Sequence, residues 1–412
     1  MKGTSMDGLV VGIDLCDAYT QVNCSDDEKT WTIPTVICRN KNADEWYVGR
    51  EAYAHTLQGD GIIVDKLVKL ALKDGTATLC DIRYTARQLL KLFLEHVLKL
   101  PAKEYGDRPI LRLVIAVPKL EAGLIRLLKE CGRQLGFQDH QVHLISHPES
   151  FTYYMLSQKK DLWNGVVGMF DLSAERLRYY EMKVQRGMKK TLVLTEYEEL
   201  EEGFNLDILS TPSGCRLADM ILSSCAERMM QKKSYSSVFL TGKGFERQEW
   251  AEEFMKKISG SRRIYFEEAL FSKGAAYKAM DFLEEKTRYP YTCICEGRLK
   301  STISMNVLHK GQETSVVLAA AGDQWYEREA VLDVIPDRQK TVDFVVTPLD
   351  TRQKKLVSIP LEGFPERPDR TTRVHIQVRF LDERTMDVHV KDQGFGDLFP
   401  SSGVQLRQEV ML

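Results

Sequence analysis

The hydrophobic pattern of this 412-residue chain changes its period near residue 285. Before that point, short apolar runs alternate with amphipathic stretches, and apolar residues at i, i+1, i+4 and i+5 predict a helix over 89–98. After it, helical spacing disappears, and 374–380 alternates apolar and polar residues as a half-buried strand does. Strands separated by helices form a largely parallel sheet, whereas strands without helices form an all-β domain. The sequence therefore predicts two domains of different class.

The boundary between these domains is expected at 284–290, where Lys, Arg and Pro interrupt a helical pattern. Residues 1–285 are predicted to form the α/β domain, and 291–412 an all-β sandwich that includes a hairpin formed by 374–380 and 386–390. Other predicted strands lie at 9–15, within 30–38 with a break at Pro34, and at 111–117, 142–145, 166–170, 177–182, 192–197, 237–241, 262–266, 314–318, 330–334, 341–346 and 356–359. Other predicted helices lie at 120–135, from about 149, and at 214–230, 246–258 and 269–283.

Charge and cysteine content exclude several classes of protein. A net charge of -2 offers no electrostatic footprint for nucleic acid, and no apolar run approaches the roughly 18–20 residues of a membrane span. Nine cysteines, an odd number in a large chain, indicate reduced thiols. Because no apolar leader follows Met1, we expect a soluble, cytoplasmic protein with neither nucleic acid nor membrane as partner.

Metal sites find little support in the spacing of cysteines and histidines. Cys293 and Cys295 resemble half a metal site, but no second pair has matching spacing, so alternate residues on one strand are the favoured interpretation. His143, His147 and Glu149 lie close together in sequence, but no third convergent ligand can be placed for them. We expect no metal site.

Two apolar strands each run into an Asp-Leu pair. The first is Gly12-Ile-Asp14-Leu15 and the second is Gly168-Met-Phe-Asp171-Leu172. A carboxylate at the end of a strand, followed by a tight turn, can orient metal-bound water while backbone N–H groups approach phosphates. The duplication predicts that Asp14 and Asp171 face one another across a cleft.

The order of further segments resembles the DnaK-like heat-shock chaperones of the actin-like ATPase superfamily over almost the whole chain. This resemblance implies a duplicated, ribonuclease-H-like ATPase fold followed by a substrate-binding β-sandwich. The matching segments are Gly12-Ile-Asp14-Leu15, Ile33-Pro-Thr-Val-Ile37, Tyr47-Val-Gly49-Arg-Glu-Ala52, Ile63-Val-Asp-Lys66-Leu-Val-Lys69, Val114-Ile-Ala-Val-Pro118, Gly132-Arg-Gln-Leu-Gly136, Leu144-Ile-Ser-His147-Pro148-Glu149, Leu240-Thr-Gly242-Lys-Gly244, Glu268-Ala-Leu-Phe-Ser-Lys-Gly274-Ala-Ala276 and Leu361-Glu-Gly363-Phe-Pro365.

The resemblance also implies which residues would hold ATP and Mg²⁺, if either binds. The positions of the family's catalytic groups correspond to Asp14, Lys66, His147 and Asp171, with His147 standing where the family has a glutamate. The nucleotide-binding positions are Asp14, Leu15, Cys16, Lys66, Asp171, Ser173, Gly242 and Gly244.

Departures from the family pattern fall on the phosphate site. Small residues normally follow the first Asp-Leu, whereas here Asp17 would face phosphate oxygens, and like unit charges about 4 Å apart repel by about 4 kcal/mol at an effective dielectric near 20. The second glycine run is replaced by Ser173-Ala-Glu175-Arg, which adds side chains and a charge. Only a short stretch separates 192–197 from 237–241, so the lobe that closes over adenine is largely missing. The linker is polar, and we expect no helical lid.

We therefore expect a chaperone-like binding or scaffold protein with a degenerate nucleotide site, no required cofactor and an unidentified protein or peptide partner. In this pseudo-ATPase, Lys66 would neutralise Asp14 and Asp171 inside a closed cleft. Ser358 and Pro360, on a strand that lines the peptide groove in the family, predict weak peptide binding. The alternative is a minimal, working ATPase with an unusual phosphate site.

Overall fold

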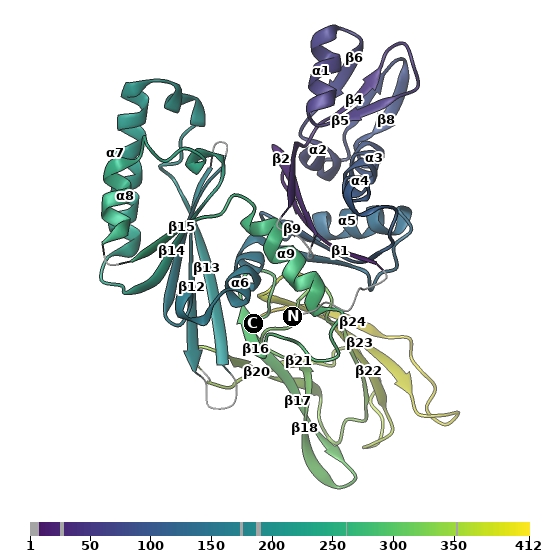
Figure 1. Ribbon diagram of the computed structural model, residues 1–412. Coiled ribbons are helices and arrows are strands. Elements are labelled where there is room, and N and C mark those ends of the chain that lie inside the picture. The colour runs from purple at the N-terminus through teal and green to yellow at the C-terminus, as the bar shows by residue number, and fades with distance from the viewer. Residues whose placement is uncertain (1–7, 25–28, 174–175, 187–190, 261, 352) are drawn as a thin grey trace. The chain divides into compact units, whose positions relative to one another are not determined.

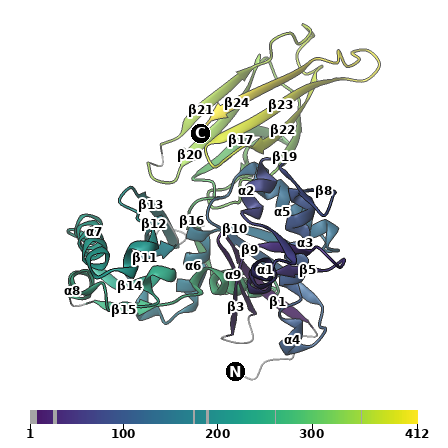
Figure 2. The same ribbon diagram turned by 90° about the horizontal axis from the view of Figure 1, so that it is seen from above.

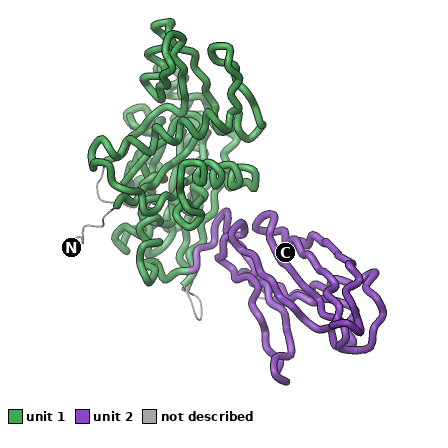
Figure 3. Tube along the Cα trace, turned by 90° about the vertical axis from the view of Figure 1, so that its right-hand side faces the viewer, with its two compact units in different colours: residues 1–291 green, residues 292–412 purple. Residues whose placement is uncertain are grey.

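The chain consists of two compact units, Met1–Tyr291 and Thr292–Leu412 (Figure 3). This computed structural model describes residues 8–24, 29–173, 176–186, 191–260, 262–351 and 353–412. The expected linker at 284–290 ends beside the division between the units.

Unit 1 contains a five-stranded sheet and five strands of a six-stranded sheet, and these two sets of five strands have the same order of connections (Figure 1). In the first, the order is β10-β9-β1-β2-β3, with β10, β9 and β1 parallel and β1, β2 and β3 antiparallel. In the second, the order is β15-β14-β11-β12-β13, again with three parallel strands followed by an antiparallel hairpin. The strands are β1 (Leu9–Leu15), β2 (Tyr19–Cys24), β3 (Thr30–Pro34), β9 (Ile110–Val117), β10 (Val142–Ser146), β11 (Val166–Ser173), β12 (Arg176–Arg186), β13 (Thr191–Leu200), β14 (Tyr235–Thr241) and β15 (Arg263–Phe266).

Two helices lie between these sheets, α6 (His147–Ser157) and α9 (Leu270–Asp281) (Figures 1 and 2). Glycines permit the close packing of both. A Cβ on Gly12 of β1 would lie 2.2 Å from the backbone nitrogen of Ala276. A Cβ on Gly274 of α9 would lie 2.0 Å from the backbone oxygen of Ser150 in α6. Backbone therefore meets backbone where α9 crosses β1 and where it crosses α6.

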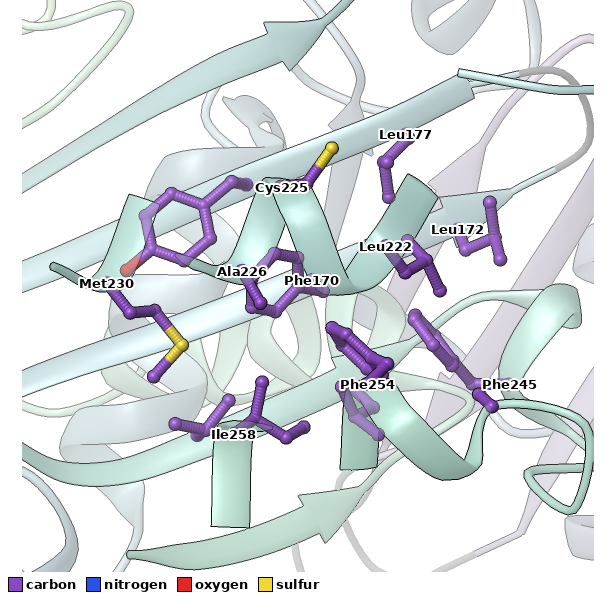
Figure 4. Packing of buried hydrophobic residues seen from close by; sticks show 14 of the residues in the cluster. Phe170, Leu172, Leu177, Leu222, Cys225, Ala226, Met230, Phe245, Phe254 and Ile258 are labelled. Atoms are coloured by element: carbon purple, nitrogen blue, oxygen red, sulfur yellow. The ribbon is translucent and has the colours of Figure 1, made fainter. Parts of the chain in front are cut away.

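The second sheet packs against α7 (Pro212–Met230) and α8 (Glu252–Ser259) through an aromatic core (Figure 4). The Phe170 and Phe254 rings meet edge to face at 5.2 Å, and Phe245 stacks on Phe254 at 5.7 Å. Asp219 of α7 accepts hydrogen bonds from the backbone N–H groups of Glu253 and Phe254, and so satisfies the start of α8. The predicted helix at 246–258 was too long at its start, since α8 begins only at Glu252.

Smaller helices, turns and strands complete unit 1. The helix α3 (Ala86–Leu98) begins with a capping box in which Thr85 and Gln88 bond to each other's backbone N–H groups. The remaining helices are α1 (Arg50–Gln58), α2 (Leu67–Leu72), α4 (Ala102–Tyr105) and α5 (Ala122–Gln134), with 3-10 turns η1 (Lys160–Leu162), η2 (Leu206–Ser210) and η3 (Lys243–Phe245). The remaining strands are β4 (Ile37–Asn40), β5 (Trp46–Val48), β6 (Gly61–Val64), β7 (Thr76–Leu79) and β8 (Ile82–Thr85).

Unit 2 contains two four-stranded antiparallel sheets, ordered β18-β17-β20-β21 and β19-β22-β23-β24. Every second residue of β22 is buried, which confirms the predicted half-buried strand and its hairpin with β23. Pro360 lies on the edge strand β21, where a missing backbone donor is tolerated. The strands of these two sheets are β17 (Ser301–His309), β18 (Gln312–Ala319), β19 (Ala330–Val334), β20 (Thr341–Pro348), β21 (Lys355–Pro360), β22 (Arg373–Phe380), β23 (Thr385–Gly394) and β24 (Gln405–Met411), while β16 (Tyr291–Ile294) is the sixth strand of the six-stranded sheet.

None of the described helices is both long enough and apolar enough to cross a lipid bilayer.

Candidate functional site

Asp14 and Asp171 occupy equivalent places in the two sheets of unit 1. Asp14 pairs with Ala116 and Asp171 with Thr241, in each case the last pair of a parallel ladder. Both residues are buried, with exposed fractions of 0% and 5%. The carboxyl ends of parallel strands are where open α/β sheets bind ligands. The duplicated strand ends therefore bring two acidic groups into the interior of unit 1.

His147 is the direct partner of Asp14. Its Nε2 lies 2.7 Å from Asp14 Oδ1, and its ring stacks on Phe271 of α9 at 3.8 Å and 11°. The helix α6 begins at His147, after Ser146 at the end of β10, and Ser146 Oγ accepts a hydrogen bond from the backbone N–H of Glu149. The cap and the aromatic stack fix the imidazole against the carboxylate.

Cys16 completes a group of three different donor atoms. Its Sγ lies 3.5 Å from Asp14 Oδ1 and 4.0 Å from His147 Nε2. Burial, followed by the charges of Asp14 and Asp171, raises the pKa of the Cys16 thiol well above its usual value. A protonated thiol is a weak nucleophile, so the arrangement does not fit cysteine-based covalent catalysis.

Asp171 has a different set of neighbours. The Ser173 hydroxyl donates a hydrogen bond to Asp171 Oδ1. Burial raises the pKa of Asp171, an effect that the Ser173 hydrogen bond and the charges of His147 and Arg178 partly offset. The charge of Asp14 raises that pKa further.

Two residues near this cluster were not singled out by the sequence. Arg178 of β12 is buried, ion-pairs with Glu199 at 3.2 Å and lies 5.6 Å from the centre of the Tyr197 ring. Tyr19 of β2 has a pKa raised by burial and then by Cys16, Asp14 and Asp171. Little in the sequence indicated that these two residues lie near the site, because an Arg or Tyr on an alternating strand usually faces solvent or packs in the core.

Lys66 does not enter the cluster. It is exposed and adopts a left-handed conformation, with φ of 51°, at the N-cap of α2. The prediction that Lys66 neutralises Asp14 and Asp171 in a closed cleft is wrong, because the turn from β6 into α2 directs the side chain to solvent.

Asp17 does not lie free beside the site. Its Oδ1 accepts hydrogen bonds from the backbone N–H groups of Val68 at 3.0 Å and Lys69 at 3.2 Å, in the first turn of α2. The expectation that this carboxylate faces phosphate oxygens is wrong, because it caps a helix instead.

Of the remaining predicted positions, Gly242 and Gly244 lie in the turn that follows β14 of the second sheet. Gly242 has φ of 93°, and a Cβ there would lie 2.5 Å from the backbone oxygen of Leu172. Gly244 packs equally close to Leu172, while Leu15 is buried in the core. Ala174 and Glu175, expected to obstruct phosphate binding, lie outside the described residues.

The other metal candidates do not converge in the described part of the chain. His143 Nε2 lies 3.0 Å from the backbone oxygen of His140, and its ring stacks on Phe282 at 3.9 Å. Neither contact involves His147 or Glu149. No disulfide joins any of the nine cysteines, all of which lie within the described residues.

Comparison with known families divides the chain as the structure does. A model of a family of unknown function, DUF5716 C-terminal, matches residues 18–296. A model of a domain of unknown function, DUF8552, matches residues 298–412. No curated protein matches the chain.

Proposed function

The chain belongs to the DUF5716 C-terminal family, and we propose that it is a chaperone-like binding or scaffold protein with a degenerate nucleotide site. In this proposal unit 1 has an actin-like ATPase fold, and unit 2 corresponds to the β-sandwich that holds substrate in DnaK-like chaperones. The repeated strand order of the two sheets supports the fold, since each has three parallel strands followed by an antiparallel hairpin.

The observation that carries the proposal is the bond between His147 and Asp14. These two groups, 2.7 Å apart, are both buried and hydrogen-bonded to each other at the position where the resemblance implies a carboxylate that orients water on a metal. A hydrogen bond to a charged group stabilises a fold by about 1.5–3 kcal/mol. Phosphate or its metal would have to displace that bond, and the exposed Lys66 offers no cation inside the site.

A working, minimal ATPase is the second candidate. Gly242 and the end of β11 meet by backbone contact at the carboxyl edge of the second sheet, where a backbone loop can approach phosphate. This candidate requires Asp14 to exchange its imidazole partner for hydrated Mg²⁺ on nucleotide binding.

Unit 2 supplies the proposed binding surface. Edge strands such as β21 offer backbone groups to an added strand, but Pro360 removes one donor from β21 and Ser358 is exposed and polar. Docking of a folded protein partner therefore suits this unit better than capture of extended peptides. The nine cysteines form no disulfide in the described part of the chain, which supports a cytoplasmic location.

The nucleotide part of the proposal is tested by thermal unfolding of the full chain in millimolar Mg-ATP or Mg-ADP. A ligand at 100 times its Kd stabilises by about 2.7 kcal/mol, which shifts a melting curve measurably. We expect no shift relative to Mg²⁺ alone, using protein first treated with a chelator. A saturable upward shift would favour the ATPase candidate.

The binding part is tested by fluorescence polarisation with labelled Leu-rich heptapeptides and the full chain. We expect no binding at low-micromolar concentration. Low-micromolar binding reversed by unlabelled peptide would restore a peptide-holding chaperone.

A further inference from the structure

The cluster of Asp14, Cys16 and His147 joins the three donor types that transition metals prefer in proteins: a carboxylate oxygen, a sulfur and an imidazole nitrogen. These donor atoms all lie within 4.8 Å of one another. They come from separate places, the end of β1, the turn after it and the first residue of α6. We propose that these three residues bind one divalent transition-metal ion, with Zn²⁺ as the best fit.

The distances are close to those of a tetrahedral site. With metal–ligand lengths of about 2.0 Å for nitrogen and oxygen and 2.3 Å for sulfur, tetrahedral geometry separates neighbouring donors by about 3.3–3.6 Å. The sulfur–oxygen distance is 3.5 Å, the sulfur–nitrogen distance 4.0 Å and the oxygen–nitrogen distance 2.7 Å. A movement of a few tenths of an ångström by each side chain therefore admits the ion.

Unused polar atoms mark the same place. Asp14 Oδ2 and His147 Nδ1 are buried and form no hydrogen bond with any described residue. Buried polar atoms without partners are uncommon, and each one calls for an explanation. Metal binding supplies one for Asp14, because a carboxylate can present Oδ2 to the ion together with Oδ1 while His147 ligates through Nε2.

Charge balance also favours a dication. Asp14 and Asp171 are both buried, and Lys66 is exposed to solvent. Zn²⁺ is neutralised by one carboxylate and one thiolate, because the ion displaces the thiol proton of Cys16 to solvent.

The donor set distinguishes this site from the magnesium site of a nucleotide-binding protein. Mg²⁺ requires near-octahedral oxygen ligands, and a thiol with an imidazole provides neither. Sulfur and nitrogen donors suit Zn²⁺ and its spectroscopic substitute Co²⁺. The inference goes beyond the proposed function and holds whether or not the chain binds a protein partner.

The experiment is a Co²⁺ titration of the full chain after treatment with a chelator. We expect one Co²⁺ per chain, a thiolate-to-metal charge-transfer band and the intense visible bands of tetrahedral Co²⁺. One equivalent of Zn²⁺ should abolish these bands, and millimolar Mg²⁺ should leave them unchanged. No uptake of Co²⁺ at stoichiometric concentration, or displacement by Mg²⁺, overturns the proposal.

Matched variants assign the ligands. Cys16→Ser should remove the charge-transfer band and weaken binding by more than about 100-fold, beyond the 10–100-fold that a supporting residue costs. Cys80→Ser, at another half-buried thiol, should leave the band unchanged, and His143→Gln serves as the control for His147→Gln. Circular dichroism without metal checks that each variant folds. If His147→Gln does not fold, the result for Cys16→Ser alone tests the proposal. A charge-transfer band of full intensity in Cys16→Ser contradicts the proposal.

Discussion

Asp14 in unit 1 and Asp392 in unit 2 are both fully buried aspartates, yet their surroundings differ sharply. Asp392 receives four hydrogen bonds of 2.8–2.9 Å, two from the Arg367 guanidinium and two from the backbone N–H groups of Gly394 and Ser402. Asp14 has His147 and the Cys16 thiol at Oδ1, and Oδ2 is left without a partner among the described residues.

The difference separates a structural carboxylate from one that is available for binding. Asp392 fixes the end of β23 against the 400–403 loop, since Arg367 also donates to the backbone oxygen of Pro400 at 2.7 Å. Every acceptor direction of Asp392 is used, as expected for a buried charge that serves the fold. Asp14 Oδ2 retains capacity for a ligand, on which the proposed metal site rests, whereas the bond from His147 at Oδ1 is the basis for the degenerate nucleotide site.

The largest expected effect comes from the same substitution at the two positions. Asp392→Asn should destabilise unit 2 by about 3 kcal/mol, because it leaves the buried Arg367 without its countercharge. Asp14→Asn in metal-free protein should cost only about 1 kcal/mol, since one hydrogen bond to His147 is weakened. Hydrogen exchange of β22–β23 amides reports the first loss, and that of β1 and β9 amides reports the second. Equal losses would show that the two carboxylates play the same role.

Acid should affect unit 2 through the same residue. The hydrogen bonds from Arg367 and the backbone hold the pKa of Asp392 below its usual value of 3.8, despite the opposing effect of burial. A lowered pKa in the folded state gives stability that is complete above the unfolded value and is lost as pH falls below it. We expect a decline of at most about 1.4 kcal/mol per pH unit below pH 3.8, measured by denaturant titration. The decline should be smaller in Asp392→Asn, and an unchanged decline would remove Asp392 from the explanation.

A smaller effect tests the corrected roles of the two residues beside the cluster. Asp17→Ala should destabilise unit 1 by about 1 kcal/mol, since it removes the cap of α2. Lys66→Ala should change stability by less than about 0.5 kcal/mol, because the side chain is exposed. Denaturant titrations compare them. The reverse order would place Lys66 in the cluster after all.

Local patterns predicted much of the fold. Period-2 alternation located the β22–β23 hairpin, and apolar stripes located α3 and α5, because one buried face imposes its period on the sequence. The strands β5–β8 were missed, since strands of three or four residues with partly exposed faces carry too little pattern, and the longer strands β2, β17 and β24 were missed as well. The predicted helix at 246–258 was too long because periodicity does not reveal that Asp219 caps α8 at Glu252.

The site was less predictable than the fold. Strand ends with Asp-Leu pointed to Asp14 and Asp171 from local sequence alone. The meeting of Cys16 with His147 joins residues 131 positions apart, which no spacing rule specifies. Lys66 and Asp17 were misplaced because the resemblance assigns a position along the chain, whereas the turn before α2 decides where each side chain points.

The central claim is that the chain functions as a binding or scaffold protein without binding nucleotide. The most direct test is a calorimetric titration of Mg-ATP into the full chain, with Mg²⁺ alone as the blank. The account predicts no heat of binding beyond dilution at millimolar nucleotide, in wild type and in Asp14→Asn alike. A saturable, one-site isotherm in wild type that disappears in Asp14→Asn would contradict it and establish an ATP-binding cleft.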